Sequence, residues 1–125
     1  MLTTPIRGAG VALVTPFDNH GNVDYPALKR VTEFTISRGI DFLVALGTTA
    51  ETPTLDKDEK QEIVRVILET NNGRKPVVLG IGGNDTRAVV KQIGDQSFKG
   101  IDYLLNVAPY YNKPNQTGHN SCSII

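Results

Sequence analysis

Two adjacent threonines and a glutamate carry the most informative polar chemistry in the sequence. Thr48, Thr49 and Glu51 follow the dense apolar run 42–46, and a helical pattern begins near Asp56. Hydroxyls, backbone amides and a carboxylate are therefore expected where a buried strand opens into a loop, the place where α/β proteins bind small molecules. Such a turn binds a carboxylate or phosphate through its N–H groups and hydroxyls. Alternatively, the threonines serve only local hydrogen bonds.

A second loop, residues 109–114, holds adjacent tyrosines between two prolines. Tyr110 and Tyr111 are suited to carrying protons or hydrogen-bonding a ligand. A phenol with a pKa near 10 is a poor base when unaided, so a relay role requires neighbouring groups. Aromatic packing at a rim or at a subunit contact is the alternative, and the residues alone favour neither.

Other candidate sites are weaker. The glycine-rich segment 80–83 is interpreted as a close-packed turn, because Asp85 stands where a dinucleotide-binding motif needs its third glycine. His20 and His119 are isolated, so no metal site is expected. Cys122 is the only cysteine, which excludes an intrachain disulfide.

Short apolar, β-branched runs begin near residues 11, 42, 77 and 103, and a loop and a helical pattern follow each of the first three. This repeat of roughly 30 residues predicts four βα units with a parallel sheet. Periodicity leaves two architectures open: a small doubly wound sheet, or half of a (β/α)8 barrel, which needs about 250 residues when whole. Residues 1–116 are expected to form this domain. Residues 117–125 follow neither a helix nor a strand period and are expected to be disordered.

Aspartates mark the start of each predicted helix. Asp24, Asp56 and Asp85 precede helical patterns and are expected to act as N-caps. In the first helix, one face is predicted from the helical spacing of four residues, namely Leu28, Val31, Phe34 and Thr35.

Composition excludes several classes of protein. The chain has 125 residues with 13 basic and 13 acidic side chains, so one domain at most is expected and the net charge is zero. No basic stripe indicates a nucleic-acid or membrane-surface partner. No apolar run approaches the roughly 20 residues of a membrane span, and the N-terminus lacks a secretory pattern. A cytoplasmic protein is expected.

Four segments together resemble one known family. Residues 12–17, 47–51, 80–84 and 108–114 occur in the order and spacing found in dihydrodipicolinate synthases, pyruvate-dependent class I aldolases and lyases. The resemblance covers residues 6 to about 116. It implies a (β/α)8 barrel, of which this chain supplies about the first four βα units. A sialic-acid lyase, another pyruvate-dependent aldolase, is expected to have serine at position 48 and a different tyrosine loop.

The resemblance also implies an activity. The family condenses pyruvate with aspartate semialdehyde on the route to diaminopimelate and lysine, through a Schiff base and without a metal or organic cofactor. Thr49 and the loop amides would hold the pyruvate carboxylate. Thr48 would pass a proton between two tyrosines, of which Tyr111 would be one, reaching in from a neighbouring subunit. Family members are dimers of dimers, and Tyr110 would lie near the tight-dimer interface.

Several positions depart from the family pattern. Ala50 replaces a glycine and would be strained if its backbone needed a positive φ. Lys57, Lys60 and Ala88 stand where lysine-inhibited members carry two histidines and a glutamate, so feedback inhibition is not expected. The pattern is lost after Gln116, and no position here matches the Schiff-base lysine or the second relay tyrosine. We therefore expect this chain to be inactive alone. The alternative is a non-catalytic half-barrel that associates with another chain.

Overall fold

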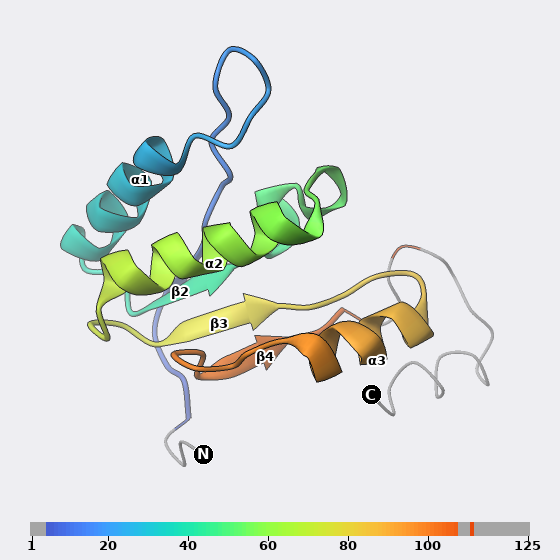
Figure 1. Ribbon diagram of the computed structural model, residues 1–125. Helices are drawn as coiled ribbons and strands as arrows, with labels where there is room; N and C mark the ends of the chain where they lie inside the picture. Colours follow the sequence, from blue (N-terminus) through green and yellow to red (C-terminus); the bar gives the residue numbers. More distant parts are fainter. Residues whose placement is uncertain (1–4, 108–110, 112–125) are drawn as a thin grey trace.

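The computed structural model describes residues 5–107 and residue 111, in which strands and α-helices alternate along the chain (Figure 1). The elements are β1 (Gly10–Ala12), α1 (Tyr25–Ser37), β2 (Phe42–Ala45), the 3₁₀ turns η1 (Thr48–Ala50) and η2 (Thr52–Thr54), α2 (Lys57–Asn71), β3 (Val77–Gly80), α3 (Thr86–Asp95) and β4 (Tyr103–Leu105). All four strands begin within one residue of the predicted positions, which confirms the repeating βα pattern.

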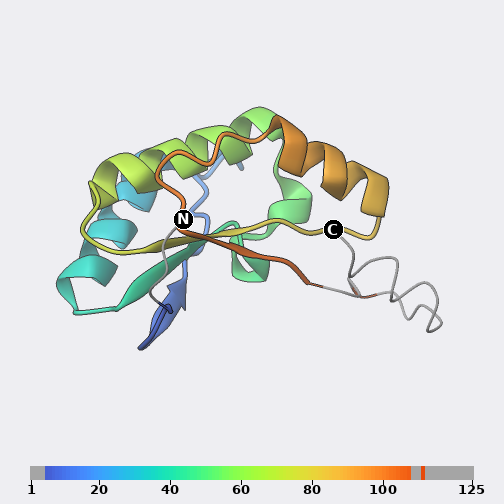
Figure 2. The same ribbon diagram turned by 90° about the horizontal axis from the view of Figure 1, so that it is seen from below.

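The strands form one parallel sheet in the order β1-β2-β3-β4. Figure 2 shows the three helices on one side of the strands. Right-handed crossovers that always step in the same direction place their helices on one face of the sheet. A doubly wound sheet instead reverses direction and carries helices on both faces. The sheet therefore has the arrangement of half of a barrel, and the doubly wound alternative is excluded.

The two faces of the sheet differ in burial. Val11, Leu43 and Val77 are paired across β1, β2 and β3 and pack into the core under the helices. Ala12 and Val44, one residue further along, are paired with each other and point to the opposite face, because side chains alternate along a strand. This opposite face is the inner face of the half-barrel.

The predicted N-caps are confirmed. The Asp24 side chain accepts a hydrogen bond from the Ala27 N–H at 2.8 Å at the start of α1. Asp56 and Glu59 form a reciprocal capping box at the start of α2, with donor–acceptor distances of 2.8 and 2.9 Å. Asp85 caps α3. Each helix therefore begins directly after the loop that leaves the carboxyl end of a strand.

The predicted placement of Phe34 on one face with Leu28 is wrong. Helix α1 buries Leu28, Thr32 and Ile36, which recur every four residues along one stripe. Phe34 lies two positions from Thr32 and therefore on the other side of the helix, where it is 60% exposed. The guanidinium of Arg38 lies 5.0 Å from the centre of its ring, a cation–π contact.

None of the described helices is long and apolar enough to cross a membrane. The predicted tail, residues 117–125, lies outside the described residues.

Candidate functional site

The threonine loop leaves β2 through a sharp change of backbone direction. Leu46 has a φ of 52°, a left-handed conformation that costs a non-glycine residue about 1–2 kcal/mol. Its side chain is buried, which holds this conformation in place. Gly47 then starts the turn η1, in which the Ala50 N–H donates to the Gly47 carbonyl at 3.0 Å. Thr48 and Thr49 are both exposed at the beginning of this turn, where N–H groups have no acceptor within the turn.

Both neighbouring strands hold this loop. From the loop after β1, the Thr15 hydroxyl donates a buried hydrogen bond to the Ala50 carbonyl at 2.8 Å. On the other side, a Cβ atom at Gly80 would lie only 2.3 Å from the Leu46 carbonyl oxygen. Gly80, the last residue of β3, therefore permits a close backbone approach. The predicted close packing of the glycine-rich segment is found at this residue, whereas residues 81–83 form no assigned turn.

Ala50 does not carry the strain that a positive φ would cause. It is buried and forms part of the right-handed turn η1, whereas the next residue, Glu51, takes the left-handed conformation with φ 56° and ψ 40°. Alanine therefore fits this position without a backbone penalty.

A small pocket of about 40 Å³ opens at the carboxyl ends of β2, β3 and β4. Thr48, Gly80, Gly82 and Val107 are among the residues that line it. The structure thus brings Thr48 together with the glycine-rich segment, while Thr49 lies outside the lining.

Tyr111 is 73% exposed, with a φ of 60°. It does not line the pocket that contains Thr48. The other members of the tyrosine loop, including Tyr110 and Lys113, lie outside the described residues. The proposed relay between Thr48 and Tyr111 therefore stays a prediction.

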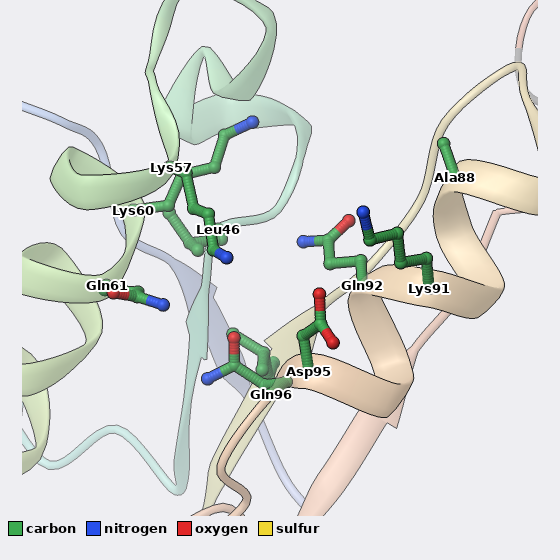
Figure 3. A pocket seen from close by; sticks show the side chains of 10 residues that line it. Leu46, Lys57, Lys60, Gln61, Ala88, Lys91, Gln92, Asp95 and Gln96 are labelled. Atoms are coloured by element: carbon green, nitrogen blue, oxygen red, sulfur yellow. The ribbon is translucent and has the colours of Figure 1, made fainter.

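A larger pocket of about 300 Å³ lies between α2 and α3 (Figure 3). Lys57, Lys60 and Ala88, which the resemblance placed at one inhibitory site, do line the same pocket. The contribution of α3 residues Lys91, Gln92 and Asp95, and of Gln96 directly after the helix, was not predicted from the sequence. The sequence does hold a pattern that predicts this contribution, because residues 88, 91, 92, 95 and 96 are spaced to lie on one side of a helix.

The described residues contain no group of three or more His, Cys, Asp or Glu side chains placed to hold a metal ion. The groups with shifted pKa values are not among the residues that line the pocket containing Thr48. Backbone N–H groups of Asn22 and His20 lower the pKa of the Asp18 carboxyl. A hydrogen bond from Arg74 lowers the pKa of Glu33 and joins the segment after α2 to α1.

The four parallel strands are paired in sequence order, and the helices lie on one face of the sheet (Figure 2). A small pocket opens at the carboxyl ends of the strands. These features place this chain in the (β/α)8-barrel class. Solved barrels agree with this assignment. Dihydrodipicolinate synthase from Acinetobacter baumannii, in complex with pyruvate, superposes with a TM-score of 0.87 at 37% identity, over 95% of this chain and 41% of that one. Dihydrodipicolinate synthase from Thermotoga maritima superposes with a TM-score of 0.85 at 38% identity, over 94% of this chain and 40% of that one.

The particular family follows from the sequence comparison. The family model for the dihydrodipicolinate synthetase family matches residues 5–122, and the chain belongs to that family. The 4-hydroxy-tetrahydrodipicolinate synthase of Cytophaga hutchinsonii is 55% identical over 111 residues, which are 89% of this chain and 37% of that protein. The enzyme of Phocaeicola vulgatus is 51% identical over 118 residues, which are 94% of this chain and 40% of that protein. The chain thus spans about two fifths of the length of its relatives.

Proposed function

We propose that this chain forms the first four βα units of a lyase that condenses pyruvate with aspartate semialdehyde, as 4-hydroxy-tetrahydrodipicolinate synthases do. The observation that carries the proposal is the turn with Thr48 and Thr49, whose exposed hydroxyls follow a barrel strand in a chain of this family. A pyruvate complex among the similar structures supports the choice of substrate. The reaction belongs to diaminopimelate and lysine biosynthesis, for which a cytoplasmic location is proposed.

Thr49 is proposed to hold the pyruvate carboxylate. Its hydroxyl is exposed at the start of η1, beside backbone N–H groups that the turn itself does not use. A hydrogen bond to a charged group contributes about 1.5–3 kcal/mol. The buried bond from Thr15 to Ala50 fixes the turn, so these donors are positioned before the substrate arrives.

Thr48 and Tyr111 are proposed to move protons during formation of the Schiff base. A lysine amine adds to the ketone of pyruvate, water leaves as the imine forms, and loss of a methyl proton gives the enamine that attacks the aldehyde carbon. A threonine hydroxyl both donates and accepts, so Thr48 at the pocket wall can pass a proton from one phenol to another. Tyr111 would come from a neighbouring subunit of a homo-oligomer, and no metal or organic cofactor is proposed.

The lysine itself is proposed to come from βα units beyond these four. The lysines of the described residues lie on helices or beside the amino ends of strands, and none lies within a strand. Treatment of the pure chain with pyruvate and borohydride, after circular dichroism shows that it is folded, is therefore expected to give no adduct by intact mass. A stable adduct at one lysine would contradict this assignment.

The inner face and both sheet edges are proposed to be covered by further βα units, from the same polypeptide or another chain. Leu105 and Val107, at and beyond the end of β4, are each 44% exposed, and β1 and β4 are edge strands of the sheet. Exposed apolar side chains and unpaired edges favour association. Light scattering is expected to show association of the pure chain. A clean monomer with cooperative unfolding would contradict this part of the proposal.

The activity is tested in a chimera in which residues 5–116 replace the matching part of the Cytophaga hutchinsonii enzyme. Thr48→Val and Tyr111→Phe are each expected to lower kcat about 100-fold or more. Thr49→Val is expected to raise the KM for pyruvate about tenfold, the loss of one charge-assisted hydrogen bond. Thr35→Val on α1 is the matched control, because its hydroxyl bonds the Val31 carbonyl within the helix.

Two further measurements on the chimera separate the alternatives. Chelator treatment is expected to leave turnover unchanged. Cleavage of sialic acid without turnover of aspartate semialdehyde would favour a sialic-acid lyase. Full activity of both the Thr48→Val and the Thr49→Val variants would contradict the proposal, because it depends on these two hydroxyls.

A further inference from the structure

A short segment occurs twice in the chain in nearly identical form, each time at the start of a strand. Residues 39–43 read Gly-Ile-Asp-Phe-Leu and lead into β2, and residues 100–104 read Gly-Ile-Asp-Tyr-Leu and lead into β4. Gly39 and Gly100 both have a φ of 84°, which glycine adopts without strain. The two segments therefore enter their strands in the same way.

The aspartate of each segment joins its strand to the preceding one. The Asp41 carboxylate accepts a hydrogen bond from the Ala9 N–H at 2.7 Å, and the Asp41 N–H donates to the Ala9 carbonyl at 2.9 Å. Asp102 makes the same pair of bonds with Val77, at 2.8 and 2.9 Å. We call this pair of bonds an aspartate clamp. It holds the β1–β2 and β3–β4 junctions.

The β2–β3 junction has no aspartate clamp. Pro76 precedes β3 and has neither an N–H nor a polar side chain. Its carbonyl accepts a hydrogen bond from the Leu43 N–H at 3.0 Å. Ala9, which precedes β1, has no carboxylate either. Clamped and unclamped junctions therefore alternate across the sheet, and the same alternation at the free edge of β4 calls for a strand that enters as β1 does.

The inner face of the sheet carries no charge on its strands. One row of paired residues crosses all four strands on this face, and two further pairs flank it: Ala12, Val44, Val78 and Tyr103, with Gly10 beside Phe42 and Gly80 beside Leu105. None of these side chains is charged. Two copies of this face can therefore meet without electrostatic repulsion.

We propose that a second copy of this chain covers the inner face and closes an eight-stranded barrel. A two-fold axis along the barrel pairs β4 of each copy with β1 of the other, and rotation about that axis keeps all strands parallel. The sheet already has the required curvature, because it superposes on solved barrels. Both new junctions are unclamped, and every aspartate clamp is already satisfied within its own chain.

This surface is the one that the proposed function leaves to further βα units, so the dimer rests on that proposal and names the partner. A two-fold arrangement uses both open edges of both copies. No edge then remains for a third copy, and association stops at two chains.

The tilt of barrel strands sets the register at the new junctions. A row of paired residues descends toward the amino ends by about eight residues around a whole barrel, and hence by about four residues for each copy. The row that ends at Tyr103 therefore continues at Gly8 of the second copy.

This register places large side chains beside small ones. It brings Leu105 beside Gly10 of the second copy and Val107 beside Ala12. Leu105 and Val107 are each 44% exposed in the single chain. Glycine and alanine leave room for them, as close packing of the barrel interior requires.

Multi-angle light scattering on the 125-residue chain tests the dimer. The mass of two chains is expected, and it falls to that of one chain on dilution. Ala12→Lys and Val107→Glu each bury an unpaired charge in the dimer, and each is expected to give the mass of one chain. Val90→Lys is the matched control, because Val90 is 51% exposed on α3, away from the inner face. This variant is expected to keep the mass of two chains.

An equal mixture of the Ala12→Lys and Val107→Glu chains tests the β4–β1 junction itself. In a dimer with one chain of each kind, the introduced ammonium and carboxylate meet at one junction, and the other junction is unmodified. The mixture is therefore expected to regain the mass of two chains, with one of each kind by native mass spectrometry. Circular dichroism establishes that each variant keeps its helices, and the two changes lie at different strands, so a folding defect in one leaves the other decisive.

Three results would overturn the dimer. They are the mass of one chain at about 100 μM, far above a micromolar Kd, a mass above two chains, and a mass of two chains that neither folded variant lowers. Failure of two folded variants to recover on mixing would overturn the β4–β1 junction. The chimera assay is independent of these results, since an inactive chimera contradicts the lyase proposal and leaves the mass of this chain unchanged.

Discussion

Replacement of Gly80 by alanine tests how the threonine loop is held. The added Cβ atom would lie 2.3 Å from the Leu46 carbonyl oxygen, 2.7 Å from the Leu46 carbonyl carbon and 3.0 Å from the Gly47 nitrogen. All three are backbone atoms, so no side-chain rotation relieves the contact. The end of β3 or the Leu46–Gly47 segment must move by about 1 Å, and overpacking of this kind costs about 1–3 kcal/mol.

Urea unfolding of the chain measures this cost. For an m-value of about 1–2 kcal/mol/M, Gly80→Ala is expected to lower the midpoint by about 1 M at unchanged m. Gly94→Ala is the matched control, because a Cβ atom there meets nothing within 4 Å. Gly94 lies in α3, where alanine is expected to stabilise the helix by up to about 1 kcal/mol. The same chemical change is thus expected to have opposite signs at the two positions.

The same substitution bears on catalysis. In the chimera, displacement of the threonine loop by about 1 Å is expected to lower kcat/KM about 100-fold. Equal urea midpoints for Gly80→Ala and the unmodified chain would show that the end of β3 can shift without a loss in the free energy of unfolding. The account of a loop fixed by its neighbouring strands would then be refuted.

Thr15→Val is expected to destabilise the chain by about 1–3 kcal/mol in urea unfolding, because the buried Ala50 carbonyl loses its donor. Thr15→Ser should keep most of the stability, and an equal loss of stability in both variants would contradict the role of the hydrogen bond. Asp56→Ala removes the cap of α2 and is expected to cost about 1 kcal/mol and to lower helicity by circular dichroism, whereas an unchanged midpoint would argue against the capping box. Arg74 lowers the folded-state pKa of Glu33 below its unfolded value, so this contribution to stability is present above the unfolded pKa and is lost as the pH falls through the folded one. Arg74→Gln should raise the pKa of Glu33 in a carbon-13 NMR titration, and an unshifted titration would be the contrary result.

The main elements of the fold could be predicted because their signals are local. Short apolar β-branched runs mark the strands, and Asp24, Asp56 and Asp85 mark the helix starts through hydrogen bonds that span two or three residues. The choice between a half-barrel and a doubly wound sheet needed the order of the strands, which depends on contacts between residues of different βα units. Periodicity carries no information about that order.

The details of the site were less predictable because backbone conformation and helix rotation decide them. The left-handed residues of the loop are Leu46 and Glu51, and Ala50 between them is not strained. Thr32 takes a core position on α1 because its hydroxyl bonds the Leu28 carbonyl and so hides its polarity. Phe34 is exposed as a result, although its hydrophobicity alone favours burial.

The strand order also has a consequence for biosynthesis. Gly10 pairs with Phe42, Leu43 with Val77 and Val78 with Tyr103, so every pairing joins one βα unit to the unit made just before it. Each pairing closes a loop of similar, moderate length, and the entropic cost of closure grows only slowly with length. The sheet can therefore grow strand by strand as the chain leaves the ribosome, since no strand waits for a later one to be inserted beside it. Throughout this growth the newest strand remains an open edge, and protection of that edge by chaperones would matter most until the next unit emerges.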